Sequence, residues 1–172
     1  METVYLRALE LNDLERTHRW HNDPALYETV VGAFRYVSRA AEEEWLCQKQ
    51  AFSNQEVNLA LCLTSDSTHI GNIYLRNINW IARHAEVAGL LIGEPEQRSK
   101  GYGTTALRLL IQHAFRDLGL LRLYAFILEE NQPVRRVIEK CGFIVEGKLR
   151  KHAYKNGEFK NVLVVGLCFA DR

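Results

Sequence analysis

Residues 96–115 read EQRSKGYGTTALRLLIQHAF. The segment begins polar and is interrupted by glycine. It then has a helical pattern, because Leu110 and Ile111 follow Leu107 by three and four residues and so share one helix face with it. A glycine-containing loop that leads into a helix presents backbone N–H groups to an anion. The stretch therefore predicts an anion-binding loop over 98–104 followed by an amphipathic helix.

Two other glycine-loop motifs fit this stretch less well. A P-loop requires GxxxxGK[ST], but here Lys100 precedes its glycine and no lysine follows the motif. A dinucleotide-binding fingerprint matches residues 101–106 as GxGxxA, but residues 94–100 separate it from the preceding apolar run. That fingerprint also needs an acidic residue about 20 positions further on, where this chain is apolar. A plain glycine-rich connection remains the structural alternative.

Apolar patterns on either side of the loop predict the strands. They are expected at 3–8, 57–63, 69–80, 84–93 and 121–128, with two more at the C-terminus joined by Asn156-Gly157. The three middle runs, separated by short polar breaks, are typical of an antiparallel meander.

Capping signals predict the helices. Asn12, with Glu15 three residues on, is expected to open a first helix that ends before Pro24, and Ser38 a second one. The helix of the 96–115 segment should end at Gly119, and a last helix should end at Gly142. The order β-αα-βββ-α-β-α-ββ predicts a single mixed α/β (α+β) domain over 1–172.

Composition excludes several classes of protein. The 172 residues carry 22 Lys and Arg against 21 Asp and Glu, so no overall charge favours nucleic acid or an anionic membrane. No apolar run is long enough to span a membrane, and no signal peptide is evident, so we expect a cytoplasmic protein. The four cysteines stand singly in apolar runs, without CxxC spacing, which predicts reduced, buried thiols and no metal site: Cys47, Cys62, Cys141 and Cys168.

Four motifs along the chain resemble the GNAT family of N-acetyltransferases. Arg98-x-x-Gly101-x-Gly103 resembles that family's acetyl-CoA loop, [Q/R]-x-x-G-x-[G/A]. His84-Ala85-Glu86 and the residues up to the loop resemble its fourth strand. Residues 129–143, EENQPVRRVIEKCGF, resemble its asparagine loop and the helix that follows. The ending FIVEGKLRKHAYKNGEFKNVLVVGL resembles the terminal hairpin of the branch with ribosomal-protein N-terminal, polyamine and amino-sugar acetyltransferases.

The resemblance covers essentially the whole chain and implies a fold and a cofactor. The fold would be a mostly antiparallel sheet of about seven strands, splayed where acetyl-CoA binds. Gly89 would form a bulge that opens the sheet there, or would simply save space. Asn131 would lie beside the pantetheine arm or cap the next helix. The other implied cofactor-binding residues are the strand edge Leu90, Leu91 and Ile92, and the pyrophosphate loop Arg98, Ser99, Lys100, Gly101, Tyr102, Gly103 and Thr104.

The resemblance also suggests catalytic groups. A protonated amine must lose a proton before it attacks a thioester. Glu86 is the candidate base, acting through a water molecule, and its alternative is a salt-bridged strand carboxylate. The tyrosine that many family members use to protonate the leaving thiolate is replaced here by Ile138, which we expect in the core. Tyr154 could act as the acid instead, or could simply pack.

The acceptor is the open question. It should lie between the first two helices and the terminal hairpin, where Glu42, Glu43 and Glu44 look like a solvated helix start. The expected partner is a small amine or a protein N-terminus. No nucleic acid or membrane is expected as a partner, and the chain could form a homodimer. A regulatory module that binds acyl-CoA without turnover is the alternative function. Several aromatic and histidine side chains are expected near the acceptor, where they could line a pocket or simply form core: Trp20, His21, Tyr27, Tyr36 and Trp45.

Overall fold

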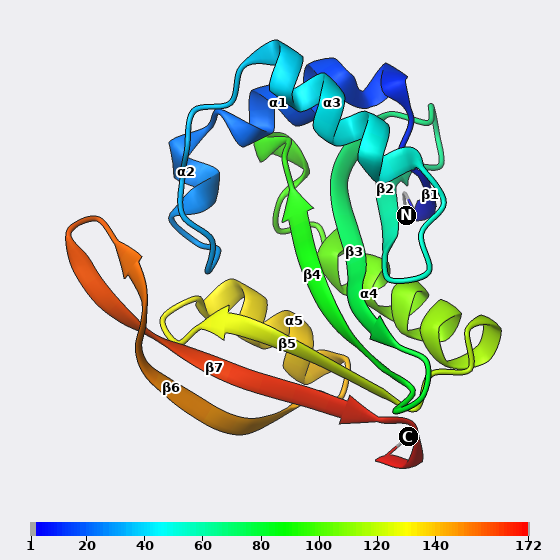
Figure 1. Cartoon of the computed structure of the whole chain (residues 1–172), viewed down its shortest axis with the longest axis vertical. Helices are drawn as coiled ribbons and strands as arrows, with labels where there is room; N and C mark the ends of the chain where they lie inside the picture. Colours follow the sequence, from blue (N-terminus) through cyan, green and yellow to red (C-terminus); the bar gives the residue numbers. More distant parts are fainter. Residues whose placement is uncertain (1–2, 172) are drawn as a thin grey trace.

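The structure, a computed structural model, describes residues 3–171 and contains one seven-stranded sheet in the order β1-β2-β3-β4-β5-β7-β6 (Figure 1). The strands are β1 (Val4–Ala8), β2 (Val57–Leu63), β3 (His69–Asn79), β4 (His84–Ile92), β5 (Arg122–Leu128), β6 (Ile144–Lys155) and β7 (Glu158–Cys168). The expected strands and their order along the chain are confirmed.

The sheet divides at its one parallel pair. β4 and β5 pair only from His84–Arg122 to Glu86–Tyr124, whereas every other neighbouring pair is antiparallel. Beyond these residues the two strands separate, as Figure 1 shows. We call this divergence the fork. The expected splay of the sheet is confirmed.

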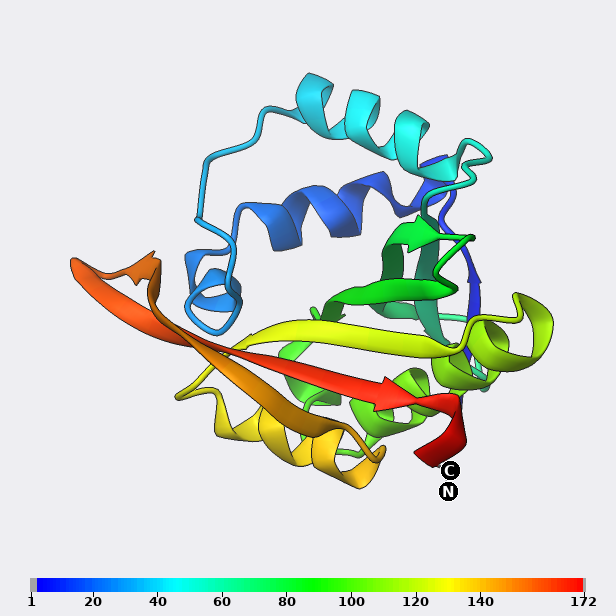
Figure 2. The ribbon, with the colours of Figure 1, turned by 60° about the horizontal axis from the view of Figure 1, so that its bottom comes forward.

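The helices form two layers. α4 (Tyr102–Gln112), the π-helical turn η3 (His113–Asp117) and α5 (Gln132–Lys140) cover one face, where Leu107 and Leu110 pack with Val87 of β4 and Leu123 of β5. α1 (Leu14–His21) and α3 (Arg39–Gln50) lie on the other face, over a smaller core that includes Leu46 (Figure 2). A short α2 (Pro24–Tyr27) comes between α1 and α3 along the chain. 3₁₀ turns occur at Leu11–Asp13 (η1), Pro95–Gln97 (η2) and Phe169–Asp171 (η4).

Most helix ends are where their signals place them. Ser38 Oγ accepts a hydrogen bond from the Ala41 N–H at 3.2 Å, which confirms the second cap. Gly119 and Gly142 have positive φ values of 64° and 89°, as expected of residues that terminate helices. The turn of the hairpin is also confirmed, since Asn156 and Gly157 both have positive φ, as a two-residue type I′ turn requires.

The first helix begins differently from the expectation. The expected cap, Asn12, lies inside the 3₁₀ turn η1, and no side-chain hydrogen bond caps the start of α1. Asp13 makes the decisive contact instead, because its Oδ2 accepts the Glu10 N–H at 2.9 Å. The prediction of a capping box at Asn12 was therefore wrong. The carboxylate of the next residue, Asp13, accepts the Glu10 N–H at the start of the helical segment instead.

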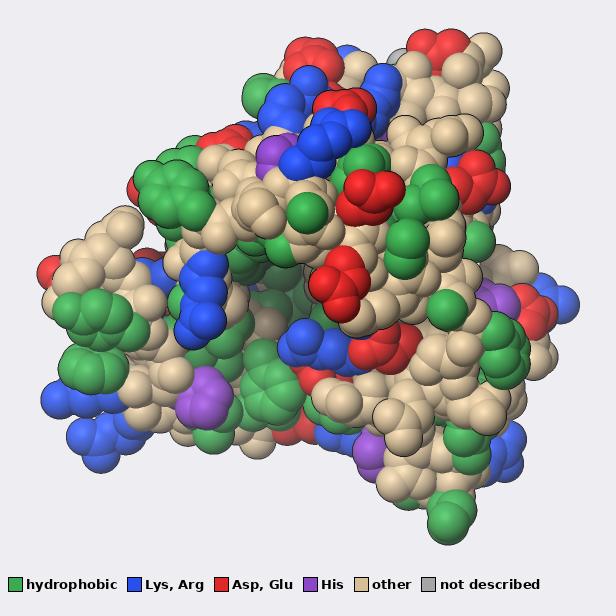
Figure 3. All heavy atoms as spheres, turned by 45° about the horizontal axis from the view of Figure 1, so that its top comes forward, with side chains coloured by type: hydrophobic (Ala, Val, Ile, Leu, Met, Phe, Trp, Pro, Cys, Tyr) green, Lys and Arg blue, Asp and Glu red, His purple; other side chains and the backbone are tan. Residues whose placement is uncertain are grey.

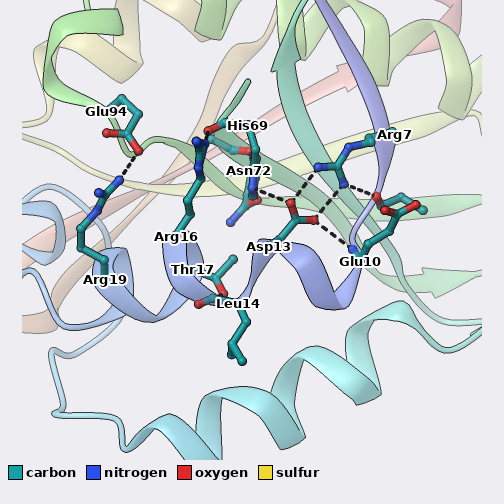
Figure 4. A network of polar contacts seen from close by, with 12 residues as sticks. Arg7, Glu10, Asp13, Leu14, Arg16, Thr17, Arg19, His69, Asn72 and Glu94 are labelled. Carbon is teal, nitrogen blue, oxygen red and sulfur yellow. Dashed lines mark hydrogen bonds and ion pairs between the residues drawn. The ribbon is translucent and has the colours of Figure 1, made fainter. Parts of the chain in front are cut away.

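Asp13 is the centre of a buried polar network (Figure 4). Its side chain is 3% exposed, and it accepts two hydrogen bonds from Arg7, at 2.7 and 2.8 Å. His69 Nδ1 lies 3.0 Å from Asp13 Oδ1. Burial opposes ionisation of Asp13, but the hydrogen bonds from Arg7 and His69 together hold the pKa of its carboxyl well below the usual range. The network joins β1 to the start of the helical layer.

Candidate active site

The fork brings two polar side chains of neighbouring strands together. Ala85 and Val87 point into the core beneath α4, so Glu86 between them points to the opposite face of the sheet. Tyr124, directly opposite Glu86 in the parallel register, lies between core residues Leu123 and Ala125 and points the same way. Glu86 and Tyr124 are therefore the last pair before the strands separate.

Gly89 forms the bulge that the sequence predicts. Between Leu91 and Ala88, β4 has one more residue than β3 has between Asn72 and Tyr74. Gly89 has φ +63°, and a Cβ there would lie 2.3 Å from the Tyr74 ring. Only glycine fits this conformation and this close approach. The bulge bends β4 beside the fork, where its edge toward β5 is no longer paired within the sheet.

The predicted anion-binding loop, residues 98–104, which we call the anion loop, follows at the end of this edge. Ser99 and Gly101 have φ values of 62° and 87°, and α4 begins directly after Gly101. Left-handed residues that alternate with ordinary ones turn successive N–H groups toward one concave side, and the start of a helix adds its positive dipole. The buried Tyr102 ring belongs to the core, so this residue can serve an anion only through its backbone.

The loop's cations are placed differently from each other. Arg98 folds back and donates from Nε to the Ile92 carbonyl at 3.0 Å and from a terminal nitrogen to the Gly93 carbonyl at 3.1 Å. Lys100 is exposed and donates to Gln97 Oε1 at 3.0 Å. Arg98 thus shapes the loop by fixing the end of β4.

Helix α1 fits against the same strand end. A Cβ on Gly93 would lie 2.1 Å from the Trp20 indole, so the glycine permits the helix to approach closely. Trp20 is 2% exposed, and the neighbouring Arg19 forms an ion pair with Glu94. Trp20 is therefore a core residue that packs beside the loop, so for this side chain the packing alternative holds.

Both oxygens of Glu86 have partners. Oε1 accepts from Arg76 at 2.5 Å, Oε2 accepts from Asn77 Nδ2 at 2.9 Å, and the residue is 4% exposed. The contacts are those of a salt-bridged strand carboxylate. Each carboxylate oxygen can nevertheless accept more than one hydrogen bond, so a water molecule at the fork could still be activated. Action as a base stays a prediction.

Sequence reasoning missed Tyr124, because only the sheet order places it beside Glu86. Burial, and secondarily the negative charge of Glu86, raise the pKa of the Tyr124 phenol. The phenol is thus a proton donor at neutral pH. Its ring packs edge-on against Phe126 and His84.

The other candidate residues have structural contacts. Asn131 Oδ1 accepts from the Val134 N–H at 3.1 Å, and its Nδ2 donates to the Thr29 carbonyl at 2.6 Å, so it caps α5 and ties it to the segment after α2. Tyr154 is 59% exposed near the tip of the hairpin, with its ring against Phe159. Their cofactor and acid roles stay predictions. Ile138 is in the core, as expected.

The region where the acceptor is expected contains a cavity between α1, α2 and α3. It measures about 210 Å³ and is lined by His21, Tyr27, Val37, Glu42 and Trp45. Of the other expected lining residues, Tyr36 is 86% exposed on the surface. The same side of the molecule is hollowed, with hydrophobic side chains deep in the hollow (Figure 3).

The expectation that Glu42 is solvated was wrong, whereas Glu43 and Glu44 are exposed as expected. Glu42 is 1% exposed, and its Oε2 lies 2.6 Å from His21 Nδ1. It lies four residues before the buried Leu46 and so shares the inner face of α3. That spacing is the signal that could have identified it.

Local hydrogen bonds hold the cavity wall. Asn22 Oδ1 accepts from the Val37 N–H at 3.0 Å, and its Nδ2 donates to the Val37 carbonyl at 2.9 Å. Lys155 of the hairpin donates to the Tyr27 carbonyl at 2.8 Å and also to Gly32. Burial lowers the pKa of Lys155. The C-terminal hairpin is thereby fastened to the segment that forms the cavity.

The remaining sequence expectations concern cysteines, metals and membranes. Cys62 is buried and Cys141 and Cys168 are half-buried, but Cys47 is exposed, so the expectation of four buried thiols was wrong for Cys47. Among residues 3–171, no three His, Cys, Asp or Glu side chains are grouped to hold a metal ion. None of the described helices is both long and apolar enough to cross a membrane.

A sheet that opens between two parallel strands, beside a glycine-containing loop at a helix start, is the arrangement that the resemblance to the GNAT family implies. The chain belongs to the acetyltransferase (GNAT) family, whose domain matches residues 3–144. A spermidine N(1)-acetyltransferase of Escherichia coli is 30% identical over 165 residues, which cover 94% of this chain and 83% of that protein. A putative ribosomal N-acetyltransferase of Bacillus subtilis is 35% identical over 105 residues, covering 61% of this chain and 56% of that protein.

Solved structures give the same result. Spermidine N-acetyltransferase from Vibrio cholerae, in complex with CoA and spermine, superposes with a TM-score of 0.89 at 28% identity, covering 98% of this chain and 97% of that one. A probable acetyltransferase superposes with a TM-score of 0.87 at 29% identity, covering 100% of this chain and 96% of that one. The chain is thus an acetyltransferase of the GNAT type.

Proposed function

We propose that the protein moves the acetyl group of acetyl-CoA directly onto a primary amine at the fork. The observation that carries this proposal is the end of β4–β5 pairing at Glu86–Tyr124, which leaves a bulged strand edge leading to the anion loop. A strand edge can pair with the amides of pantetheine, and the loop can bind the pyrophosphate, so the residues fit the co-substrate. Bound acetyl-CoA supplies a thioester as the acyl donor.

The chain's own groups have complementary roles in this proposal. The backbone of Leu90, Leu91 and Ile92 orients the donor. Glu86 removes a proton from the incoming ammonium through a water molecule, since the free amine is the nucleophile. Tyr124, kept protonated by its surroundings, is better placed than Tyr154 to protonate the departing thiolate, because it lies at the fork itself.

A small amine is the acceptor that the observations favour over a protein N-terminus. The relatives include spermidine N-acetyltransferases, and the cavity beside α2 is small, at about 210 Å³. The test is release of free thiol from acetyl-CoA in the presence of a panel of diamines, amino sugars, aminoglycosides and short peptides. Turnover of at least one small amine is expected. CoA binding without turnover of any amine would instead identify a regulatory acyl-CoA-binding module.

The loop can be tested without knowing the acceptor. Gly101→Val should weaken CoA binding at least ten-fold in calorimetry. A Cβ there meets nothing within 4 Å, so the effect arises from φ +87°, a conformation that costs an L-residue about 1–2 kcal/mol and that the anion-binding N–H groups require. Gly157→Val is the matched control, because it has φ +83° and equally open surroundings, but in the hairpin turn. The control should lose stability while its affinity for CoA stays unchanged; equal affinity in both variants would contradict the loop assignment.

A further inference from the structure

The cavity between α1, α2 and α3 has features that acetyl transfer alone does not explain. Its volume of about 210 Å³ is below the range of about 300–1,000 Å³ for pockets that enclose a whole drug-sized ligand. It therefore fits one end of a ligand, a group of a few heavy atoms. Its walls come from the end of α1, from α2, from the segment before α3 and from α3 itself.

One wall contains a carboxylate with an unused oxygen. Glu42 is 1% exposed and lines the cavity, and His21 occupies its Oε2. Within the described chain, the buried Oε1 has no hydrogen-bond partner. A buried acceptor without a donor is costly, by about 1–3 kcal/mol and more for a charged group. This oxygen therefore favours a ligand that donates an N–H or O–H bond.

The rest of the wall selects the charge of that ligand. Trp45 packs edge-on against His21, with ring centroids 4.7 Å apart, and Tyr27 lines the same space. Burial, and after it the negative charge of Glu42, raise the pKa of Tyr27. The Tyr27 phenol thus stays neutral. Aromatic rings beside a buried carboxylate favour a cation with short alkyl substituents.

We propose that this cavity binds an alkylammonium group, with Glu42 Oε1 accepting an N–H bond and Tyr27 and Trp45 enclosing the adjoining methylenes. A carboxylate ligand would be repelled by Glu42, and an alcohol could donate a hydrogen bond to Oε1 but would bring no positive charge to it. If the ammonium is a second nitrogen of the acceptor, the inference rests on the proposed function. The binding site itself does not depend on acetyl transfer.

Direct binding tests the site without catalysis. Calorimetry should detect butylammonium binding to the wild-type protein, and 1-butanol should bind at least ten-fold more weakly. Glu42→Gln keeps the shape and a hydrogen bond to His21 but removes the charge, and should weaken butylammonium binding ten-fold or more. Glu43→Gln is the matched control, because it makes the same change at the exposed neighbouring position of α3. It should leave binding within two-fold of the wild type.

Two results would overturn the proposal. One is equal binding of butylammonium and 1-butanol to the wild-type protein, a comparison that needs no variant to fold. The other is equal butylammonium affinity in Glu42→Gln and Glu43→Gln when both variants unfold at the same denaturant concentration as the wild type.

Kinetics then distinguish two sources of the ammonium. With 1,4-diaminobutane and butylamine as acceptors, a ten-fold rise in KM confined to the diamine in Glu42→Gln assigns the site to the acceptor's second nitrogen. Unchanged KM values for both acceptors, together with lost butylammonium binding, assign it to an amine ligand other than the acceptor. Failure of every amine to turn over would refute the proposed function and leave the binding result standing.

Discussion

Glu86→Gln is expected to lower kcat/KM for the true amine acceptor by roughly 10²- to 10⁴-fold, the usual contribution of general acid–base catalysis. Glutamine fills the same space but cannot accept a proton, and CoA affinity should not change because the anion loop is elsewhere. The pH profile of kcat/KM should lose one ionisation. Measuring the profile with two acceptors of different pKa shows whether an ionisation belongs to the enzyme or to the substrate. An inflection that moves with the acceptor belongs to the substrate, and one that stays fixed belongs to the enzyme.

Glu15→Gln is the control for this substitution. Glu15 also forms an ion pair, with Arg39, but it lies on α1 and both side chains are more than half exposed. Its replacement should leave kcat/KM nearly unchanged. A loss of less than about three-fold in Glu86→Gln would mean that the contacts with Arg76 and Asn77 are the whole role of the residue.

Asp13→Asn should lower the free energy of unfolding at neutral pH by about 3–5 kcal/mol, the cost of removing one partner from a buried ion pair. The variant leaves Arg7 without its paired carboxylate. Urea unfolding measures the loss. Glu15→Gln is the control, because Glu15 pairs with Arg39 where both side chains are more than half exposed, and such pairs are worth about 0–1 kcal/mol. A loss in Asp13→Asn no larger than in this control would contradict the prediction.

The pH dependence of that loss has a definite sign. The folded protein holds the pKa of Asp13 below its unfolded value of about 3.9, so the stabilisation is fully present above the unfolded pKa. It is lost as the pH falls through the folded pKa. The difference in stability between the wild type and Asp13→Asn should therefore be constant near neutral pH and narrow progressively below about pH 4.

Local patterns predict the elements and the loop, because the signals are local. Apolar or alternating runs mark the strands, Ser38 marks a helix start, and Gly101 is a residue type that readily adopts a left-handed conformation. The bulge at Gly89 could be proposed from the sequence because a glycine within a strand often marks one, although the sequence alone does not distinguish it from a space-saving glycine.

The side chains of the site were harder to predict, because their surroundings depend on contacts distant in sequence. Tyr124 faces Glu86 only because β5 lies parallel to β4. Glu42 appears solvated among three successive acids until α3 is placed on the sheet with Leu46 inward. Asp13 is satisfied by Arg7 on β1 and His69 on β3, and the capping pattern of the helix itself does not reveal these partners.

The fork also determines how the molecule holds together mechanically. It divides the sheet into β1–β4 and β5–β7–β6. The two parts are paired along the backbone only from His84–Arg122 to Glu86–Tyr124, and they are also held together by the core beneath α4 and by the hydrogen bonds of Lys155. A ligand that lies along the open edge of β4 would pair with the backbone groups of β4 that β5 leaves unpaired, and would so add contacts between the two parts of the sheet. The co-substrate should therefore act as a structural part of the protein, raising its unfolding free energy by about 2.7 kcal/mol at one hundred times its Kd. Supply of acetyl donor in the cell would then set how long the chain survives proteolysis as well as how fast it works.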